Sequence, residues 1–226
     1  MGLTSRCTAL LAGALAWAAS ACTPSRSGAP VPGTVAAVGD SITQGVAREL
    51  PNIHTPYPDT LQRRLGPGWR VRNFGVGGYR VAEVAARWER RVRGRGYATV
   101  VVLAGINDLQ LGAAAEEVSS QLERLHQAIR ADGSTVVAVT VTPYRGWALN
   151  PWTEERQRAI DAVNARLRSS CTQPGCRLVE AGATLEDPAR PGALLPAFDQ
   201  GDHLHLSQAG LDRLAELVEA ALRQPP

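Results

Sequence analysis

The chain has 226 residues, of which 44% are hydrophobic and 20% charged, and its net charge is +3. This composition is typical of a soluble globular protein, and so small a net charge gives no reason to expect nucleic-acid binding. Beyond the N-terminal segment, about 190 residues remain, which suits a single domain with a sizeable core.

The first 21 residues have the features of an export signal. Residues 7–19 are apolar but too short and too rich in alanine to span a bilayer. Ala-Ser-Ala at residues 19–21 fits a signal-peptidase site. Cys22 follows it, so the segment resembles a bacterial lipobox, with alanine at position 19 where that motif usually has leucine. We therefore expect export, either as a cell-envelope lipoprotein lipidated at Cys22 or as a freely secreted protein.

The rest of the chain divides into a tether and one folded domain. Residues 22–33 are rich in proline, glycine and serine, which predicts a flexible tether, and the domain is expected over residues 34–226. In the domain, short apolar runs rich in β-branched residues alternate with amphipathic helical patterns. The predicted strands are residues 34–39, 70–76, 99–105, 134–141 and 177–181, and the predicted helices are residues 57–66, 81–94, 115–133, 152–170 and 207–224.

These elements predict an α/β fold with one central sheet. Strands that are apolar almost throughout are buried on both faces, which is typical of a parallel sheet covered by helices. Five such strands alternating with five helices predict a three-layer α/β/α sandwich around a five-stranded parallel sheet. In this architecture ligands bind beyond the carboxyl ends of the strands, so the residues that follow the strands are the candidates for function.

Four segments that can lie at those ends carry glycines and polar residues. Ser41 follows the first strand, where an N-cap of the next helix is the simplest explanation for it alone. A glycine-rich turn follows the second strand but lacks the spacing of a dinucleotide-binding motif. Asn107 follows the third strand and could also be a helix cap. Asp202 and His205 stand three residues apart, just before the last predicted helix.

Together and in chain order, these segments resemble the four motif blocks of the SGNH hydrolase family, also called GDSL esterases and lipases. The blocks are GDSIT, NFGVGG, GIND and DHLH, at residues 39–43, 73–78, 105–108 and 202–205. The first block has isoleucine where the family name has leucine. The resemblance runs from about residue 35 to residue 215, and it implies the flavodoxin-like SGNH fold and a serine esterase that needs no metal or cofactor.

The resemblance also implies a role for each motif residue. Ser41 would be the nucleophile, His205 the base that takes its proton, and Asp202 the residue that orients the imidazole. Attack on an ester carbonyl creates an oxyanion, for which three hydrogen-bond donors are expected. They are the backbone N–H groups of Ser41 and of Gly78, or of the glycine before it, and the side-chain amide of Asn107.

Four residues outside the motif blocks also have candidate roles. Tyr144 and Trp147 follow the fourth strand, and they either line a pocket for an acyl group or sugar or only pack the loop. Cys171 and Cys176 flank a Pro-Gly turn, which predicts a local disulfide in an oxidising compartment. A zinc site there would need a second pair of ligands. Asp40 is expected to shape the turn beside Ser41 and to take no part in chemistry.

An arginine-rich run at residues 87–96 remains outside these roles. It carries five arginines and one glutamate. The simplest interpretation is a solvated helix end, where cations suit the helix dipole. Binding of an anionic lipid or polymer is the second interpretation.

We therefore expect an exported, monomeric serine esterase that hydrolyses carboxylic esters of short acyl groups, lipids or acetylated carbohydrates. Contact with a membrane is expected only through a lipid on Cys22, and nucleic acid is not an expected partner. Two alternatives stay open. A non-catalytic, envelope-anchored binding module could keep the same fold, although it would not need Ser41, Asp202 and His205 together. An acyltransferase would use the same residues, and the sequence does not separate transfer from hydrolysis.

Overall fold

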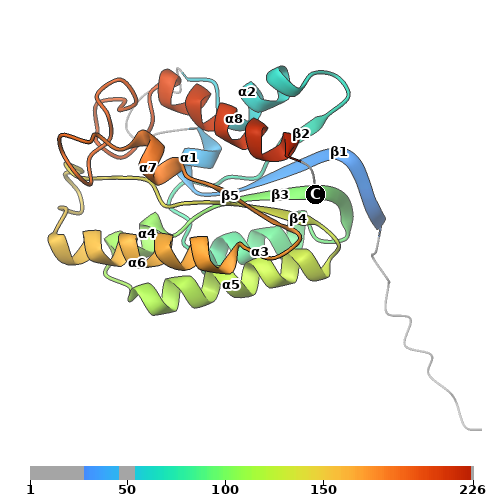
Figure 1. The fold of residues 1–226 in the computed structure, drawn as a ribbon, viewed down its shortest axis with the longest axis horizontal. Coiled ribbons are helices and arrows are strands. Elements are labelled where there is room, and N and C mark those ends of the chain that lie inside the picture. Colours follow the sequence, from blue (N-terminus) through green and yellow to red (C-terminus); the bar gives the residue numbers. More distant parts are fainter. Residues whose placement is uncertain (1–27, 46–53, 225–226) are drawn as a thin grey trace, which may run out of the picture.

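Figure 1 shows a computed structural model of the chain, which describes residues 28–45 and 54–224. The predicted signal peptide, its cleavage site and the lipidation site at Cys22 lie outside these residues. No helix in the described ranges is long and apolar enough to cross a membrane.

The described residues form the predicted α/β/α sandwich (Figure 1). Its sheet is entirely parallel and has the strand order β2-β1-β3-β4-β5. The chain first moves outward from β1 to β2 and then crosses back to β3, so the direction of winding reverses between β1 and β3. Ligands of such sheets bind at this reversal. The strands are β1 (Gly28–Gly39), β2 (Arg70–Asn73), β3 (Arg95–Leu103), β4 (Thr135–Val139) and β5 (Cys176–Val179).

Helices cover both faces of the sheet (Figure 1). One face carries α2 (Tyr57–Leu65), α8 (Gln208–Arg223) and the short α7 (Ala181–Leu185). The other face carries α3 (Val81–Arg91), α5 (Ala115–Ala131) and α6 (Glu154–Ser170). Two further one-turn helices, α1 (Ser41–Gln44) and α4 (Ile106–Gln110), follow β1 and β3 directly. The five long helices are those that the sequence predicts, whereas the three short ones are too brief to show a helical period.

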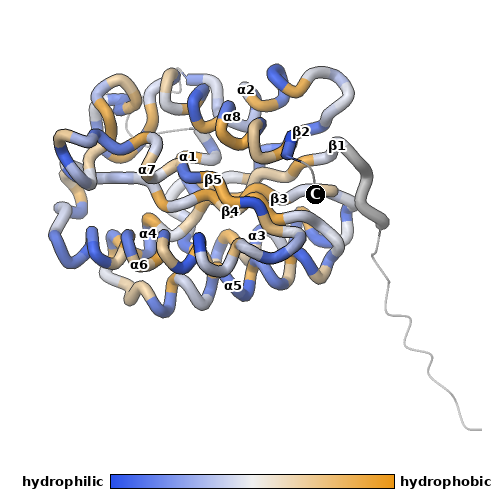
Figure 2. Tube along the Cα trace, viewed as in Figure 1, coloured by the Kyte–Doolittle hydropathy of each residue, from blue (hydrophilic) through white to orange (hydrophobic). Residues whose placement is uncertain are grey.

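Burial on both faces explains the composition of the strands. In β1, Val35 and Ala37 pack against the layer of α2 and α8, while Ala36 and Val38 pack against the layer of α3 and α5; all four are fully buried. Burying a valine side chain stabilises a fold by roughly 1.5–3 kcal/mol. Figure 2 shows the result, with hydrophobic residues along the sheet and hydrophilic ones on the outer sides of the helices.

The domain begins earlier than the sequence predicts. The backbone of β1 starts at Gly28, which pairs with Arg95, and Val31 pairs with Tyr97, so residues 28–33 belong to the sheet and not to the tether. The register shifts on either side of Val31. Prolines at positions 30 and 32 have no N–H to donate to a ladder, which accounts for an irregular strand that the sequence presents as linker.

The predicted disulfide is present. Cys171 is the C-cap that follows α6 and Cys176 begins β5, and their sulfur atoms are bonded with a Cα–Cα distance of 5.2 Å. The bridge closes the turn that connects the helix to the last strand of the sheet.

Candidate active site

The turn after β1 places Ser41 at the start of α1. The N-cap of this helix is Asp40, whose Oδ1 accepts a hydrogen bond of 3.0 Å from the backbone N–H of Ile42. Ser41 is therefore the first residue of α1, and the N-cap interpretation of Ser41 is wrong. A Cβ on Gly39 would lie 2.4 Å from the carbonyl oxygen of Leu103, so only glycine fits where β1 leaves the sheet.

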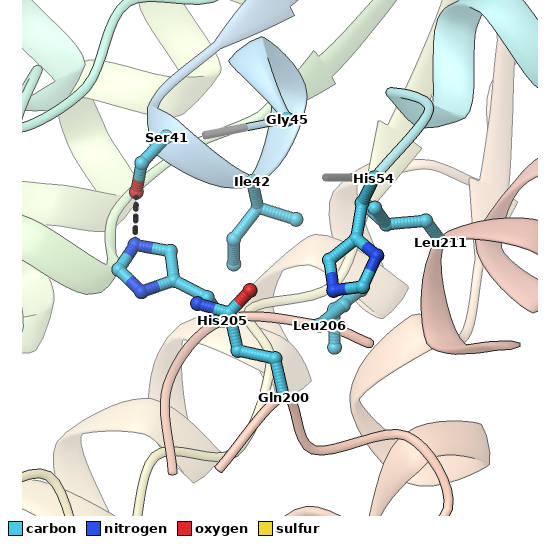
Figure 3. Close-up of a pocket in the computed structure, with 8 residues that line it drawn as sticks. All are labelled: Ser41, Ile42, Gly45, His54, Gln200, His205, Leu206 and Leu211. Carbon is cyan, nitrogen blue, oxygen red and sulfur yellow. Dashed lines mark hydrogen bonds between the residues drawn. The ribbon is translucent and has the colours of Figure 1, made fainter. Parts of the chain in front are cut away.

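The loop before α8 brings a histidine and an aspartate to this serine. His205 Nε2 lies 2.8 Å from Ser41 Oγ, a contact drawn in Figure 3, and His205 Nδ1 lies 2.6 Å from Asp202 Oδ2. The other carboxylate oxygen of Asp202 accepts the backbone N–H groups of His205 at 2.8 Å and Leu204 at 3.0 Å. These backbone bonds fix the loop so that the carboxylate, the imidazole and the hydroxyl lie in one line of hydrogen bonds.

The ionisation of Asp202 determines which nitrogen of His205 carries a proton and which group donates each hydrogen bond. Partial burial acts to raise the pKa of the Asp202 carboxyl, but hydrogen bonds from the ring and backbone of His205 and the backbone of Leu204 outweigh it and hold the pKa well below its usual range. An ionised Asp202 can only accept, so Nδ1 of His205 carries the proton. In the neutral ring Nε2 is then the acceptor, and the Ser41 hydroxyl donates to it.

Three N–H groups at the same edge of the sheet are available to an oxyanion. The backbone N–H groups of Ser41 and Gly78 donate to no acceptor within the described residues. Gly78 has a φ of +79°, and a Cβ on Gly77 would lie 3.7 Å from the Ser41 Cβ, so this turn lies against the serine. The Asn107 side-chain amide donates one hydrogen to the carbonyl oxygen of Tyr79 at 2.9 Å, which leaves its second hydrogen free.

Gly78, and not Gly77, is the glycine with the free N–H group. The N–H of Gly77 donates to Gln44 Oε1 at 2.6 Å and is already used. Of the two glycines that the sequence leaves as alternatives, only Gly78 therefore has a backbone N–H available to a ligand.

Asn73 and Gly75 hold the glycine turn in place, a role that the sequence analysis does not assign. Asn73 Nδ2 donates to the carbonyl oxygen of Thr43 at 2.8 Å, and Asn73 Oδ1 accepts the N–H of Gly75 at 2.9 Å. A Cβ on Gly75 would lie 2.3 Å from the backbone nitrogen of Gln44, so the turn reaches α1 only because this residue is glycine. The sequence feature that could have indicated this role is the spacing of asparagine and glycine within NFGVGG.

Comparison with known proteins agrees with this geometry. The family model described as GDSL-like lipase/acylhydrolase matches residues 37–213, most of the chain. The chain belongs to this family. Membership makes it a carboxylic ester hydrolase and confirms the resemblance drawn from the four motif blocks. No curated protein matches the chain.

Solved structures of other hydrolases share the fold of this GDSL-like acylhydrolase. A GDSL-like lipase from Bacteroides thetaiotaomicron superposes with a TM-score of 0.69 at 20% identity, covering 84% of this chain and 87% of the other. A catalytic mutant of an acetylxylan esterase from Geobacillus stearothermophilus superposes with a TM-score of 0.67 at 22% identity, covering 87% and 96%. At such identities the likeness establishes the shared fold.

Asp40 is buried in the turn that precedes Ser41. Its side chain is fully buried, and Oδ2 has no hydrogen-bond partner in the described part of the chain. Burial raises the pKa of the Asp40 carboxyl to about 7, against the opposing effect of the hydrogen bond from Ile42. Asp40 caps α1 and so shapes the turn beside Ser41, which is the structural role that the sequence predicts for it.

The two aromatic candidates have different positions. The Tyr144 side chain has no exposed surface and belongs to the core, so it does not line a pocket and the interpretation of loop packing holds for it. Trp147 is half-buried and lies edge-to-face against the imidazole of His205, with 5.7 Å between ring centroids. Of the two predicted substrate-binding residues, only Trp147 borders the site.

A small cavity opens beside Ser41 on the side of α8 (Figure 3). Its lining includes the imidazole of His54 and the amide of Gln200, which donates to Asp202 Oδ2 at 3.1 Å. Within the described ranges, no group of three or more histidine, cysteine, aspartate or glutamate residues could hold a metal ion. The remaining lining residues are Ile42, Gly45, Leu206 and Leu211.

Proposed function

We propose that this acylhydrolase is an exported serine esterase that cleaves esters of short acyl groups through an acyl-serine intermediate. The observation that supports this most is the line of hydrogen bonds from Ser41 Oγ through His205 to Asp202, at 2.8 and 2.6 Å. A hydroxyl becomes a competent nucleophile when a base is in place to take its proton, and this geometry provides one.

The first half of the reaction forms the acyl-serine. Ser41 Oγ attacks the ester carbonyl carbon while His205 Nε2 takes the hydroxyl proton, and Asp202 stabilises the imidazolium that results. The tetrahedral intermediate then collapses, the bond to the leaving oxygen breaks, and His205 returns the proton to that alcohol. In the second half a water molecule attacks the acyl carbon while His205 Nε2 takes one of its protons. The bond between the acyl carbon and Ser41 Oγ then breaks, His205 returns the proton to Ser41 Oγ, and the acid leaves.

The negative charge of each tetrahedral intermediate falls on the former carbonyl oxygen. The backbone N–H groups of Ser41 and Gly78 and the free amide hydrogen of Asn107 are the donors we assign to it. Each donor of this kind contributes roughly 3 kcal/mol to the transition state. The single hydrogen bond to Tyr79 fixes the Asn107 amide in advance, so little reorganisation is needed during the reaction.

The surroundings of Ser41 favour a small acyl group. The cavity beside it is narrow, with a volume of about 10 Å³, and is bordered by the buried side chains of Ile42, Leu206 and Leu211. Trp147 adds an apolar wall beside His205 that suits an acetyl group or the face of a sugar ring. One structural neighbour is an acetylxylan esterase, which makes acetylated carbohydrate the first class to test.

We propose further that the protein is exported and lipidated at Cys22, with residues 1–21 removed as a signal peptide. The support is the lipobox-like sequence and the disulfide between Cys171 and Cys176, a bond typical of oxidising compartments. Mass spectrometry of the mature N-terminus tests this directly. A diacylglyceryl group on Cys22 supports the anchor, and an unmodified N-terminus would rule it out.

The esterase function is tested by a series of p-nitrophenyl esters, from acetate to palmitate, and acetylated xylan. The chain from Thr23 onward keeps every described element and is compared with Ser41→Ala. We expect the highest kcat/KM for acetate or butyrate and near-complete loss in Ser41→Ala. A folded wild-type protein that hydrolyses none of these esters would contradict the proposal and favour the binding module.

A further inference from the structure

A groove lies at the amino ends of β2, β1 and β3, at the opposite end of the sheet from Ser41. It has a volume of about 420 Å³, and three arginines line it. Arg70 and Arg72 alternate along β2 and therefore lie on the same face of that strand, and Arg95 begins β3 opposite Gly28. In Figure 1 this is the end of the sheet where β1 begins. The other lining residues are Gly33, Thr34, Pro67, Gly68, Trp69, Gly96 and Tyr97.

The three guanidinium groups are exposed and lack acidic partners. Among the described residues, the side chains of Arg70 and Arg72 make no hydrogen bond or ion pair, and the side chain of Arg95 makes one hydrogen bond of 3.3 Å, to the carbonyl oxygen of Arg90. None of the residues lining the groove is acidic. Arg93 belongs to the same arginine-rich run as Arg95, but it forms ion pairs with two acidic side chains and does not line the groove.

The same three charges converge on one aromatic side chain. Burial raises the pKa of the Tyr97 phenol, while the guanidinium groups of Arg72, Arg95 and Arg70 are close enough to act against that rise. Trp69, which is half-buried, lines the groove with Tyr97. Tyrosine and tryptophan are the residues that settle at the headgroup level of a bilayer.

We propose that this groove binds the phosphate groups of anionic phospholipids, so that the amino end of the sheet faces the membrane. A guanidinium group matches a phosphate with two parallel hydrogen bonds, and three guanidinium groups without acidic partners form a site for such anions. The choice of a lipid surface, and not a free anion, as the source of the phosphate rests on the lipid anchor proposed at Cys22. Cys22 lies six residues before Gly28, and six residues span at most about 20 Å. An anchored chain therefore keeps the groove close to the headgroups.

This orientation has a consequence for the substrate. Ser41 follows the carboxyl end of β1, and six residues of nearly extended chain lie between it and Thr34 in the groove, which puts the two roughly 20 Å apart. With the groove on the membrane, the active site faces away from the bilayer. The esters it reaches are then those presented from the distal side, such as acyl groups on a polymer, and not the lipids to which the protein is bound.

Vesicle sedimentation tests the groove without the anchor. The unlipidated chain from Thr23 onward is mixed, at low ionic strength, with vesicles of phosphatidylcholine alone or with about a third of phosphatidylglycerol. The test variant is R70Q/R72Q/R95Q. The matched control, R124Q/R158Q/R213Q, makes the same change in net charge with three exposed arginines on α5, α6 and α8. Inorganic phosphate is titrated separately, and p-nitrophenyl acetate hydrolysis is measured for every variant.

We expect binding to the anionic vesicles only, with affinity lowered about 100-fold in the groove variant, since each arginine near an anionic surface contributes a factor of about 5. The control should lose less than about 5-fold. Equal losses in both variants would overturn the proposal, because net charge alone would then explain binding. Saturable binding of inorganic phosphate without vesicle binding would also overturn it and assign the groove to a free anion. Ester hydrolysis should be unchanged in both variants, so that loss of vesicle binding and failure of the esterase proposal are read separately.

Discussion

Two aspartate–histidine pairs share the loop before α8 and differ in what they contact. Asp199 and His203 are joined between Oδ2 and Nδ1 at 2.6 Å, and Asp202 and His205 are joined between the same atoms at the same distance. The His205 side chain is only 9% exposed, and its second nitrogen contacts Ser41 Oγ. The His203 side chain is 46% exposed, and its second nitrogen has no hydrogen-bond partner in the described part of the chain.

Asp199 and His203 stabilise the backbone conformation of the loop. His203 has a φ of +68° and is the one non-glycine residue of the described ranges with a positive φ. Asp199 Oδ1 accepts the backbone N–H groups of Gly201 at 2.7 Å and of His203 at 3.0 Å, which holds this strained conformation. A Cβ on Gly146 would lie 2.8 Å from the His203 ring, so the ring also packs closely against the neighbouring loop. Burial and a hydroxyl on the second nitrogen distinguish the two pairs, and on these two features we assign the proposed catalytic role to Asp202 and His205.

The largest effect we predict separates the two histidines. His205→Ala should lower kcat for p-nitrophenyl acetate by a factor on the order of 10⁶, because no base remains to take the Ser41 proton. His203→Ala should lower it by less than about 10-fold, through loosening of the loop. Steady-state kinetics on both variants check this, with circular dichroism to show that each is folded. Equal losses in the two variants would contradict the assignment of different roles.

The two aspartates should differ in the same way, by a smaller factor. Asp202→Asn should lower kcat about 10⁴-fold, because an amide at this position favours the wrong tautomer of His205. Asp199→Asn keeps the side-chain oxygen that accepts the backbone N–H groups, so a loss of less than about 10-fold is expected. The ratio of the two losses is measured with the same ester. A ratio near one would remove the distinction between the pairs.

A third carboxylate, Asp40, should affect stability and its pH dependence. The folded protein keeps the Asp40 proton up to about pH 7, whereas in the unfolded chain the carboxyl has its ordinary pKa of 3.8 and releases the proton near that pH. Folding therefore becomes less favourable as pH rises from about 4 to 7, by up to roughly 4 kcal/mol. In Asp40→Asn this loss is absent, so the variant should gain stability relative to wild type on going from pH 4 to pH 8. Urea denaturation at the two pH values checks the sign, and a constant difference would contradict it.

The smallest effect we expect is that of replacing Trp147, the aromatic residue that packs against His205. Trp147 contacts the His205 ring edge-to-face, and such contacts contribute roughly 0.5–1.5 kcal/mol. Trp147→Ala should therefore lower kcat/KM for short esters about 3–10-fold, while Trp147→Phe should retain most of it. A loss in both variants as large as that of Asp202→Asn would mean that Trp147 does more than pack against the ring.

The sequence predicts the layers of the fold because each layer has a strong local pattern. Strands buried on both faces are continuously apolar, and the five long helices show a clear apolar stripe. The short helices α1, α4 and α7 have at most five residues and leave no such pattern. The start of β1 is hidden for a related reason, since its prolines and glycines are typical of a linker.

The motifs and their order along the chain predict which residues form the site, but they do not predict the contacts between those residues. Ser41, Asp202 and His205 are found by the motifs, but the choice between Gly77 and Gly78 depends on the side chain of Gln44, which the sequence does not place. Tyr144 could not be assigned to the core or the pocket, because an aromatic residue in a loop suits both. The arginine groove was beyond prediction, since Arg72 and Arg95 meet only when β2 and β3 pair with β1.

The most direct test of the account is labelling with a fluorophosphonate, followed by mass spectrometry of the peptides. We predict a single adduct on Ser41 in the wild-type chain, retained in His203→Ala, much slower in His205→Ala and absent in Ser41→Ala. A folded protein that is not labelled, or one labelled equally fast with His205 removed, would contradict the claim that His205 activates Ser41.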